Sequence, residues 1–415
     1  MKKILWFEIT TPSRYKNANN VLGGWQDSLE NIVRTIPDVE LSIAFIGAST
    51  EKKEVDGVDY YSMNTHKSVK ERIVSKLTGM TDYNSLLSAM HYVIDDVKPD
   101  IIHVFGTEWP FGLIATKINI PVVIHIQGAL VPYNNALYPP SYSFADYRKL
   151  CGFNLKKLID FWSQKKNEKH QIDREHIIWK NVRYYMGRTD WDRALSGVLN
   201  HNRLYFHVDE ALRPNFLSGE CEWKPMKDGK IRLFSTGCTT FWKGPDMMIK
   251  VARILKDRGL DFEWNVAGYM PNDLKKMVEN HESTTFEENN INLLGFTKPD
   301  VLIEYLSNST LYVHTAYVEN SPNSICEAQC VGLPIVSTNV GGISTLVKNM
   351  EEGILVPAND PWQMAYHIIS LSGDEDRMRL YSENGKRHAI SRHDPETIKN
   401  QLLTCYKSII KNEQN

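Results

Sequence analysis

Residues 317–334 constrain the fold of this chain most strongly. They read as a buried strand, a polar turn that carries Glu319, and a helix. Ser321 is suited to the N-cap of this helix and Pro322 to its first position, while Gly332 is suited to end it. Strand, polar turn and helix in this order predict an α/β domain with a ligand site at the turn.

The start of the predicted helix is a seat for an anion. The backbone N–H groups of Asn323 and Ser324 have no acceptor within the helix, and the helix dipole adds positive charge there. Glu319 lies in the turn, and Glu327 lies about 9 Å further along the helix axis. Carboxylates accept hydrogen bonds from hydroxyls, so a nucleotide-sugar fits this layout. Two ordinary solvated glutamates are the alternative, which this stretch alone leaves open.

Length and composition indicate a globular protein of two domains. The chain has 415 residues, 42% of them hydrophobic and 24% charged, with a net charge of −2. Such a length predicts two domains of about 200 residues each. The charge balance gives no reason to expect nucleic acid as the main partner.

The cysteines and the apolar runs indicate a cytoplasmic location. Six scattered cysteines form no metal-ligand spacing, which predicts a reducing compartment and no structural zinc. The first residues predict a strand, not a signal peptide. No apolar run approaches the ~18 residues of a membrane span.

The first half of the chain begins like a doubly wound sheet. Residues 3–9 predict a strand, and a polar loop ending at Gly23 and Gly24 leads into a helix over residues 25–36. Adjacent glycines allow a backbone to approach a ligand, although a simple flexible turn has the same signature. Further strands are predicted at 40–47, 58–63, 100–105, 121–128, 183–187 and 204–208, with helices at 69–77, 85–97 and 190–199.

The strand at 121–128 ends in polar residues. His125, Gln127 and Gly128 follow a continuous apolar run that is typical of a strand buried on both faces. Open α/β sheets bind ligands at the carboxyl ends of their strands. We therefore expect a functional role for His125, and a structural role for His103.

Residues 129–179 depart from the alternation of strands and helices. Tyrosines and prolines break the first part, and eleven Lys and Arg face four Asp and Glu between Arg148 and Arg188. This local excess fits either a solvated helix surface or a basic face that contacts the inner leaflet of a membrane. We expect the second, slightly more than the first.

The second half repeats the alternation of predicted strands and helices found in the first half. Strands are predicted at 231–236, 262–267, 291–294, 311–315, 334–338 and 354–356, and three helices at 361–371, 374–391 and 395–411 follow them. We predict a first Rossmann-like domain at 1–212, a linker at 213–229 that is rich in proline and glycine, and a second Rossmann-like domain at 230–394. The last helix, about 395–415, is long enough to cross back over the first domain.

The first strand-to-helix turn of the second domain is a second candidate site. It contains Gly237, and Lys243 precedes a helix begun by Gly244 and Pro245. A lysine beside the free N–H groups of a helix start is a contact for phosphate. The alternative is a plain surface lysine.

Taken together, these motifs resemble retaining glycosyltransferases of the GT-B fold, specifically glycosyltransferase family 4 (glycosyl transferases group 1). The resemblance rests on Lys243–Gly244, on Glu319 and Glu327 with the residues between them, and on residues 332–342; it is most specific over 231–360. Gly23–Gly24 and residues 187–194 add weaker support. The implied fold is α/β, with two doubly wound Rossmann-like domains facing across a cleft.

The resemblance also implies roles for individual residues. Glu319 would hold hydroxyls of the donor sugar and Glu327 the ribose, while Lys243 and the amides around Ser321, Asn323 and Ser324 would bind the diphosphate. Gly23 and Gly24 would approach the phosphates from the other domain, and His125 would face the transferred sugar. One position departs from the family, because Cys238 occurs where an arginine is usual. Lys243, the helix starts or an unlocated basic residue would then balance the charge on the leaving diphosphate.

The expected reaction moves a sugar from a nucleotide-diphosphate sugar, UDP favoured over GDP, to a hydroxyl of a glycan or lipid-linked saccharide. A donor phosphate oxygen would accept the proton of that hydroxyl, with Glu319 as a covalent nucleophile in the alternative chemistry. No metal or other cofactor is expected, because helix N-termini together with Lys243 can take the electrostatic role of a divalent ion. The rival classes are a nucleotide-sugar epimerase and a non-catalytic nucleotide-sugar binding protein. Base, sugar, acceptor and oligomeric state remain open.

Overall fold

The computed structural model describes residues 1–16, 24–65, 78, 81–152, 154–219, 222–226 and 228–414. It divides into two compact units. The first comprises Met1–Val131, Asn154–Ala211 and Asp394–Asn415, and the second comprises Pro132–Phe153 and Leu212–His393. Gly23 and the helix predicted at 69–77 lie outside the described residues.

The first unit contains a sheet whose strand order is β3-β4-β2-β1-β5-β6-β7-β8. Neighbouring strands are parallel except β3 and β4, which form an antiparallel hairpin at the edge. The strands are β1 (Lys2–Glu8), β2 (Val39–Ile46), β3 (Glu51–Val55), β4 (Val58–Met63), β5 (Ile101–Phe105), β6 (Val122–His125), β7 (Tyr184–Gly187) and β8 (Leu204–His207).

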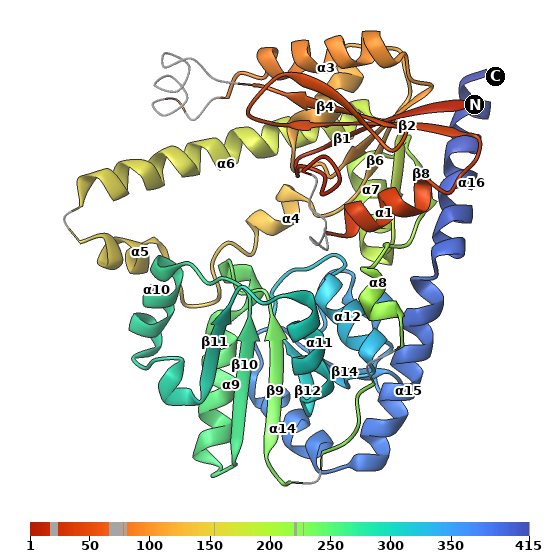
Figure 1. Ribbon diagram of the computed structural model, residues 1–415. Coiled ribbons are helices and arrows are strands. Elements are labelled where there is room, and N and C mark those ends of the chain that lie inside the picture. Colours follow the sequence, from red (N-terminus) through yellow and green to blue (C-terminus); the bar gives the residue numbers. More distant parts are fainter. Residues whose placement is uncertain are drawn as a thin grey trace. The chain divides into compact units, whose positions relative to one another are not determined.

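Helices cover both faces of this sheet (Figure 1). Ile4 and Trp6 of β1 join one core with α1 and α16, while Leu5 and Phe7 join another with α3, η1 and the end of α6. Burial on both faces explains the continuous apolar runs of the central strands. The helices are α1 (Trp25–Val33), α3 (Asn84–Val97), η1 (Pro110–Thr116), α6 (Leu155–Asn181), α7 (Asp190–Leu199) and α16 (Pro395–Gln414), and the unit boundary falls within α4 (Leu130–Asn134).

The second unit contains a wholly parallel sheet with the order β11-β10-β9-β12-β13-β14. The chain winds outward from β9 in one direction and from β12 in the other, so these neighbours form the switch point at which open α/β sheets bind ligands. The strands are β9 (Ile231–Thr236), β10 (Phe262–Ala267), β11 (Ile291–Gly295), β12 (Leu311–His314), β13 (Ile335–Thr338) and β14 (Gly353–Val356).

The helices of the second unit pack around one continuous core. Within the described ranges, no helix of either unit is both long and apolar enough to cross a bilayer. The helices of this unit are α5 (Phe144–Cys151), α8 (Pro214–Leu217), η2 (Phe241–Lys243), α9 (Pro245–Asp257), α10 (Asn272–Glu282), η3 (Glu287–Asn289), α11 (Pro299–Ser307), α12 (Asn323–Val331), α13 (Ile343–Leu346), α14 (Pro361–Ser372) and α15 (Glu375–Arg392).

The structure assigns two stretches of the chain to the second unit that were predicted to lie outside the second domain. Residues 132–153 belong to the second unit, where the Tyr142 ring stacks on His281 at 3.8 Å between centroids and the Tyr142 hydroxyl donates to Glu282. The stretch expected as a linker also packs onto this unit. Phe216 and Trp223 are buried in its core, and the Trp223 indole donates to the Ser309 carbonyl.

Strand β3 is absent from the elements predicted above, and one helix cap lies one residue from its predicted position. Strand β3 has the sequence Glu-Lys-Lys-Glu-Val and lies at an exposed edge, so it has no apolar signal. Asp56 and Gly57, both at positive φ, form its hairpin turn and are the signal that could have revealed it. The predicted N-cap Ser321 is wrong by one residue, because α12 begins after Pro322.

We expect Trp264→Ala to lower the free energy of unfolding of the second unit by about 3–5 kcal/mol, because it leaves a large cavity. Trp264 is fully buried, and its indole N–H donates to the Ser235 hydroxyl at 2.9 Å. Guanidinium denaturation followed by circular dichroism measures the change. Trp362→Ala, at a position that is 71% exposed, should stay within about 0.5 kcal/mol of wild type. Equal effects of the two variants would contradict the packing described here.

Candidate donor site of the second unit

The candidate site lies where β9 and β12 end. Residues 237–244 follow β9 and lead into α9, and residues 315–322 follow β12 and lead into α12. Both loops therefore emerge at the switch point of the sheet. The residues predicted to contact the donor lie on these loops or in α12, apart from Gly23, Gly24 and His125, which belong to the first unit.

Backbone contacts fasten the two loops to each other. The Thr315 hydroxyl donates to the Lys243 carbonyl at 2.9 Å, and the Tyr317 amide donates to the Trp242 carbonyl at 2.7 Å. Gly244 has φ +73°, and a Cβ there would lie 2.1 Å from the Thr315 carbonyl oxygen. Only glycine fits at this position. These contacts between the two loops fix the position of the Lys243 backbone, from which its side chain extends.

Lys243 and Glu319 form an ion pair in which the ammonium donates to Glu319 Oε1. The side chain of Glu319 is 7% exposed, and that of Lys243 is 24% exposed. The pair was predicted only as two separate ligand contacts, 76 residues apart. It brings an acceptor for sugar hydroxyls and a cation for phosphate to one place.

The turn after β13 supports the backbone of Glu319. Gly341 has φ +54°, and a Cβ there would lie 1.6 Å from the Glu319 carbonyl oxygen. The amide of the next residue, Gly342, donates to that same oxygen at 3.1 Å. Glu319 is thus held by its main chain as well as by Lys243. Both glycines lie within residues 332–342, which carry part of the family resemblance, but no role was predicted for them.

The start of α12 has the open amides that were predicted. The amides of Ile325 and Cys326 donate to the Pro322 carbonyl, at 3.0 and 3.4 Å. Among the residues that the structure describes, the amides of Asn323 and Ser324 have no acceptor. Ser321 precedes the helix and is buried. The positive end of α12 therefore lies just beyond the turn that carries Glu319.

Tyr312 of β12 links the end of β9 to the start of α12. Its hydroxyl lies 3.1 Å from the Thr236 hydroxyl and also forms a hydrogen bond with the side chain of Ser324. Burial raises the pKa of Tyr312 to about 12, so the phenol stays protonated. The predicted residue Ser324 is in this way joined to the end of β9, which Gly237 follows in the chain. Sequence reasoning missed Tyr312, which reads as one apolar residue of a strand.

Cys238 supplies no positive charge to the site. Its side chain is fully buried in the core of the second unit, with Sγ 3.9 Å from the Met248 sulfur. Burial raises the pKa of the thiol to about 12. The family resemblance leads us to expect an arginine at position 238. The positive charge that such an arginine would bring is missing here.

Glu327 is paired with Arg213. Glu327 Oε1 accepts hydrogen bonds from Nε of Arg213 at 3.1 Å and from Nη2 at 2.5 Å. The Glu327 side chain is 7% exposed. Arg213 was placed in the predicted linker and given no role. The pairing spans 114 residues and has no local signal that could have revealed it.

The predicted residues of the first unit lie in different settings. Gly24 is the exposed N-cap of α1 at φ −68°, a conformation that does not require glycine. His125 is fully buried, with its ring 5.0 Å from that of Trp25. Burial first, then the neighbouring His103 and the charge of Arg188, hold the pKa of His125 well below its usual range, so the ring is neutral. The roles proposed for both residues stay predictions.

Residues 187–194, which gave weaker support to the resemblance, build a helix start. Thr189 and Asp192 form a capping box at α7, and Arg188 pairs with buried Glu210 while its guanidinium lies over the Trp25 ring. The side chains of this motif therefore organise the carboxyl end of β7 in the first unit.

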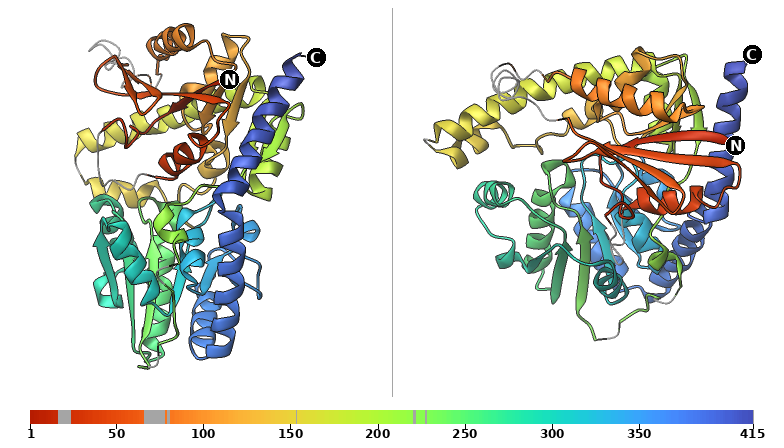
Figure 2. Two further views of the ribbon diagram at one scale, coloured as in Figure 1. Left: turned by 45° about the vertical axis from the view of Figure 1, so that its right-hand side comes forward. Right: turned by 45° about the horizontal axis from the view of Figure 1, so that its top comes forward.

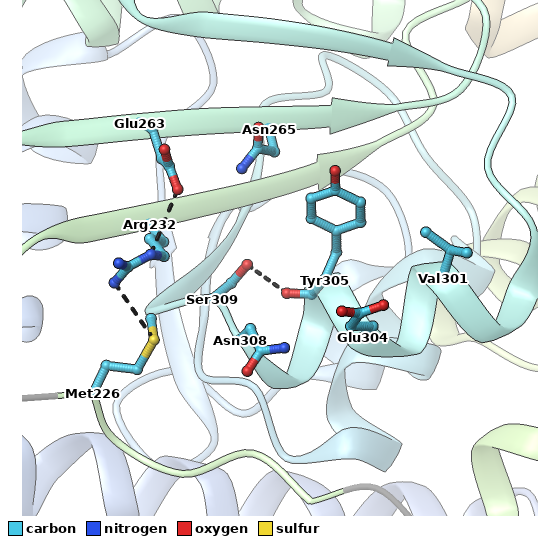
Figure 3. A pocket seen from close by; sticks show the side chains of 9 residues that line it. All are labelled: Met226, Arg232, Glu263, Asn265, Val301, Glu304, Tyr305, Asn308 and Ser309. Carbon is cyan, nitrogen blue, oxygen red and sulfur yellow. Dashed lines mark hydrogen bonds and ion pairs between the residues drawn. The ribbon is translucent and has the colours of Figure 1, made fainter.

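A cavity of about 470 Å³ in the second unit lies away from these loops (Figure 3). Arg232 and Glu263 line it and are residues of the amino-terminal halves of β9 and β10, at the opposite end of the sheet from the candidate site. Two of its charged residues are paired within the protein, because Arg232 pairs with Glu263 and also with Asp228. Nothing in its lining matches the predicted ligand contacts.

The arrangement can hold a diphosphate between Lys243 and the amides of α12, with carboxylates on either side for hydroxyl groups. In the part of the chain that the structure describes, no group of three or more His, Cys, Asp or Glu side chains is placed to bind a metal ion.

Comparisons with solved structures define the class of fold. Sucrose-phosphate synthase from Thermosynechococcus elongatus aligns with a TM-score of 0.71 at 13% identity, over 99% of this chain and 100% of that one. HepE of Anabaena, solved in complex with UDP-glucose, aligns with a TM-score of 0.66 at 14% identity, over 98% of this chain and 100% of that one. The predicted fold class, α/β with the two Rossmann-like domains of the GT-B fold, is confirmed.

Sequence comparisons point the same way over the second unit. The family model of glycosyl transferases group 1 matches residues 222–388. The amylovoran biosynthesis glycosyltransferase AmsK of Erwinia amylovora is 29% identical over 151 residues, which is 35% of this chain and 37% of that protein. The chain spans less than half the length of the first curated relatives that it matches. The matched family segment contains Lys243, Glu319 and Glu327.

We expect Gly341→Ala to lower the free energy of unfolding by more than about 2 kcal/mol, because a methyl group would displace the Glu319 carbonyl. Thermal unfolding followed by calorimetry measures the loss. Gly373→Ala is the matched control, since Gly373 has φ −92° and a Cβ there would meet its nearest atom at 3.7 Å. A Gly341→Ala protein as stable as the control would show that the turn is not packed as described.

Proposed function

We propose that this chain is a retaining glycosyltransferase that moves a sugar from a UDP-sugar to a hydroxyl of a glycan or lipid-linked saccharide in bacterial surface polysaccharide synthesis. The observation that carries the proposal is the Lys243–Glu319 pair beside the open amides of α12. The match of the family model to this same segment supports it. AmsK, a glycosyltransferase of amylovoran biosynthesis by its name, supports the polysaccharide context.

In the proposed reaction the bond between the anomeric carbon and the diphosphate breaks, and the acceptor oxygen bonds to that carbon on the same face. The acceptor proton passes to a phosphate oxygen of the donor, so no protein base is needed. Glu319 holds hydroxyls of the sugar, and Lys243 with the amides of Asn323 and Ser324 stabilises the charge on the leaving diphosphate. No metal ion takes part in this scheme. The complex of HepE with UDP-glucose supports UDP as the nucleotide.

UDP should raise the melting temperature of the wild type more than GDP or ADP does. A ligand at ~100 times its dissociation constant adds about 2.7 kcal/mol of stability, which thermal scanning detects. Glu327→Ala should lose this shift, because it removes the acceptor for the ribose hydroxyls. A wild type that none of the three nucleotides stabilises would contradict the proposed donor site.

Glu319→Gln should lower turnover of the UDP-sugar at least tenfold, because the amide accepts hydrogen bonds from sugar hydroxyls more weakly than a carboxylate does. Product formation with a saccharide acceptor is followed by mass spectrometry, with and without EDTA. Near-full turnover by this variant would exclude both roles considered for Glu319. A new sugar epimer without any glycoside would favour the epimerase, and binding without turnover would favour the non-catalytic protein.

The acceptor proposal rests on the amino-terminal half of α6. This half extends beyond the sheet of its own unit in both views (Figures 1 and 2). Leu155, Ile159 and Trp162 recur at helical spacing on one face and are 72%, 57% and 57% exposed. Exposed lysines, Lys156 and Lys166 among them, flank this apolar stripe. Exposed apolar residues flanked by lysines suit the interface of an anionic lipid surface.

Replacing Leu155, Ile159 and Trp162 together by serine should reduce sedimentation with vesicles of phosphatidylcholine and phosphatidylglycerol at least tenfold. Glutamate at Lys156, Lys157, Lys165 and Lys166 should do the same, because each basic residue near such a surface contributes about 1 kcal/mol. The matched control replaces Trp362 and Tyr366 of α14 by serine, an exposed aromatic pair at the same spacing. If the wild-type protein does not sediment with these vesicles, the membrane proposal is wrong. The donor proposal is unaffected by this result.

A further inference from the structure

We propose that Arg213 is a positioning residue of the donor site, which holds the Glu327 carboxylate in place for the ribose hydroxyls of the nucleotide. The inference rests on the proposed function, because it assigns a role within the same site. Arg213 lies between the two Rossmann-like folds in the sequence, ahead of β9, and belongs to the second unit.

The geometry of Arg213 is that of a residue held on more than one side. Its guanidinium donates twice to Glu327 Oε1 and lies 4.9 Å from the centre of the Phe216 ring. Its main chain is the N-cap of α8, and α8 packs against α12, the helix that carries Glu327. Arg213 and Glu327 are therefore fixed to one another through both their side chains and their helices.

This contact determines how Glu327 can meet a ligand. Both hydrogen bonds go to Oε1, so they fix the position of this oxygen and restrict how the carboxylate can turn. A carboxylate held in one orientation loses less conformational entropy when it accepts hydrogen bonds from a ribose. Arginine suits this task because its planar fork forms two contacts at once.

The charges around the diphosphate seat give a second reason. Glu319 and Glu327 bring two negative charges, and Lys243 brings one positive charge. Cys238, at the position where the family resemblance leads us to expect an arginine, is buried with a raised pKa and brings none. Arg213 restores the balance, so that a diphosphate does not enter a site with net negative charge.

The test is a double-mutant cycle on nucleotide affinity, measured by titration calorimetry. It uses Arg213→Met, Glu327→Gln and the double variant, with UDP and with 2′,3′-dideoxy-UDP, which lacks the ribose hydroxyls. We expect Arg213→Met to weaken UDP binding about tenfold or more, and to add no further loss in the Glu327→Gln background. The dideoxy analogue should lose clearly less affinity than UDP does in Arg213→Met, because only the effect of the lost charge remains when the ribose hydroxyls are absent.

Losses that add in the double variant, or an equal loss with the dideoxy analogue, would show that Arg213 contacts the phosphates itself and would overturn the proposal. Undiminished UDP affinity in Arg213→Met would overturn it as well. Arg232→Met is the matched control, since Arg232 is also paired with carboxylates but lies at the other end of β9. If Arg213→Met does not fold, the double variant without either charge and Arg213→Lys complete the comparison, with Arg213→Lys expected to lose affinity for UDP but not for the dideoxy analogue. A wild type that fails to bind UDP, GDP or ADP contradicts the proposed function instead.

Discussion

The candidate site depends on the strand order of the second sheet, in which the chain continues in opposite directions from the neighbouring strands β9 and β12. Parallel strands pair side by side, and the connections leave the sheet in opposite directions from this pair. Two loops that belong to opposite halves of the unit therefore begin next to each other. The central ion pair of the site uses this proximity, because Lys243 comes from one loop and Glu319 from the other.

Close backbone packing turns that proximity into a fixed geometry. Gly244 lies against the Thr315 carbonyl, and Gly341 lies against the Glu319 carbonyl, each at a positive φ. Neither position has room for a side chain, so the loops approach as closely as two backbones can. The backbones of Glu319 and Lys243 are thereby fixed, although their side chains are flexible.

The sequence predicted those parts of the molecule that leave a local signal. Apolar runs located strands such as β5 and β12, and Gly332 marked the end of α12. Ser321 followed by Pro322 is compatible with a helix start at either residue, so local chemistry could not decide the cap. The Arg213–Glu327 pair joins residues far apart in the chain, and the packing of Tyr142 on the second unit depends on tertiary contacts. No periodicity encodes such pairings.

The Lys243–Glu319 pair has a consequence for which molecules can bind at the diphosphate site. Because Lys243 is paired with a carboxylate, an inorganic phosphate ion would have to compete with Glu319 for this cation. Such an ion is itself negatively charged and repels the carboxylate that it displaces. A molecule that carries hydroxyl groups beside its phosphates can satisfy both members of a pair at once. Paired charges would therefore act as a filter that keeps abundant cellular anions, inorganic phosphate among them, from occupying the seat.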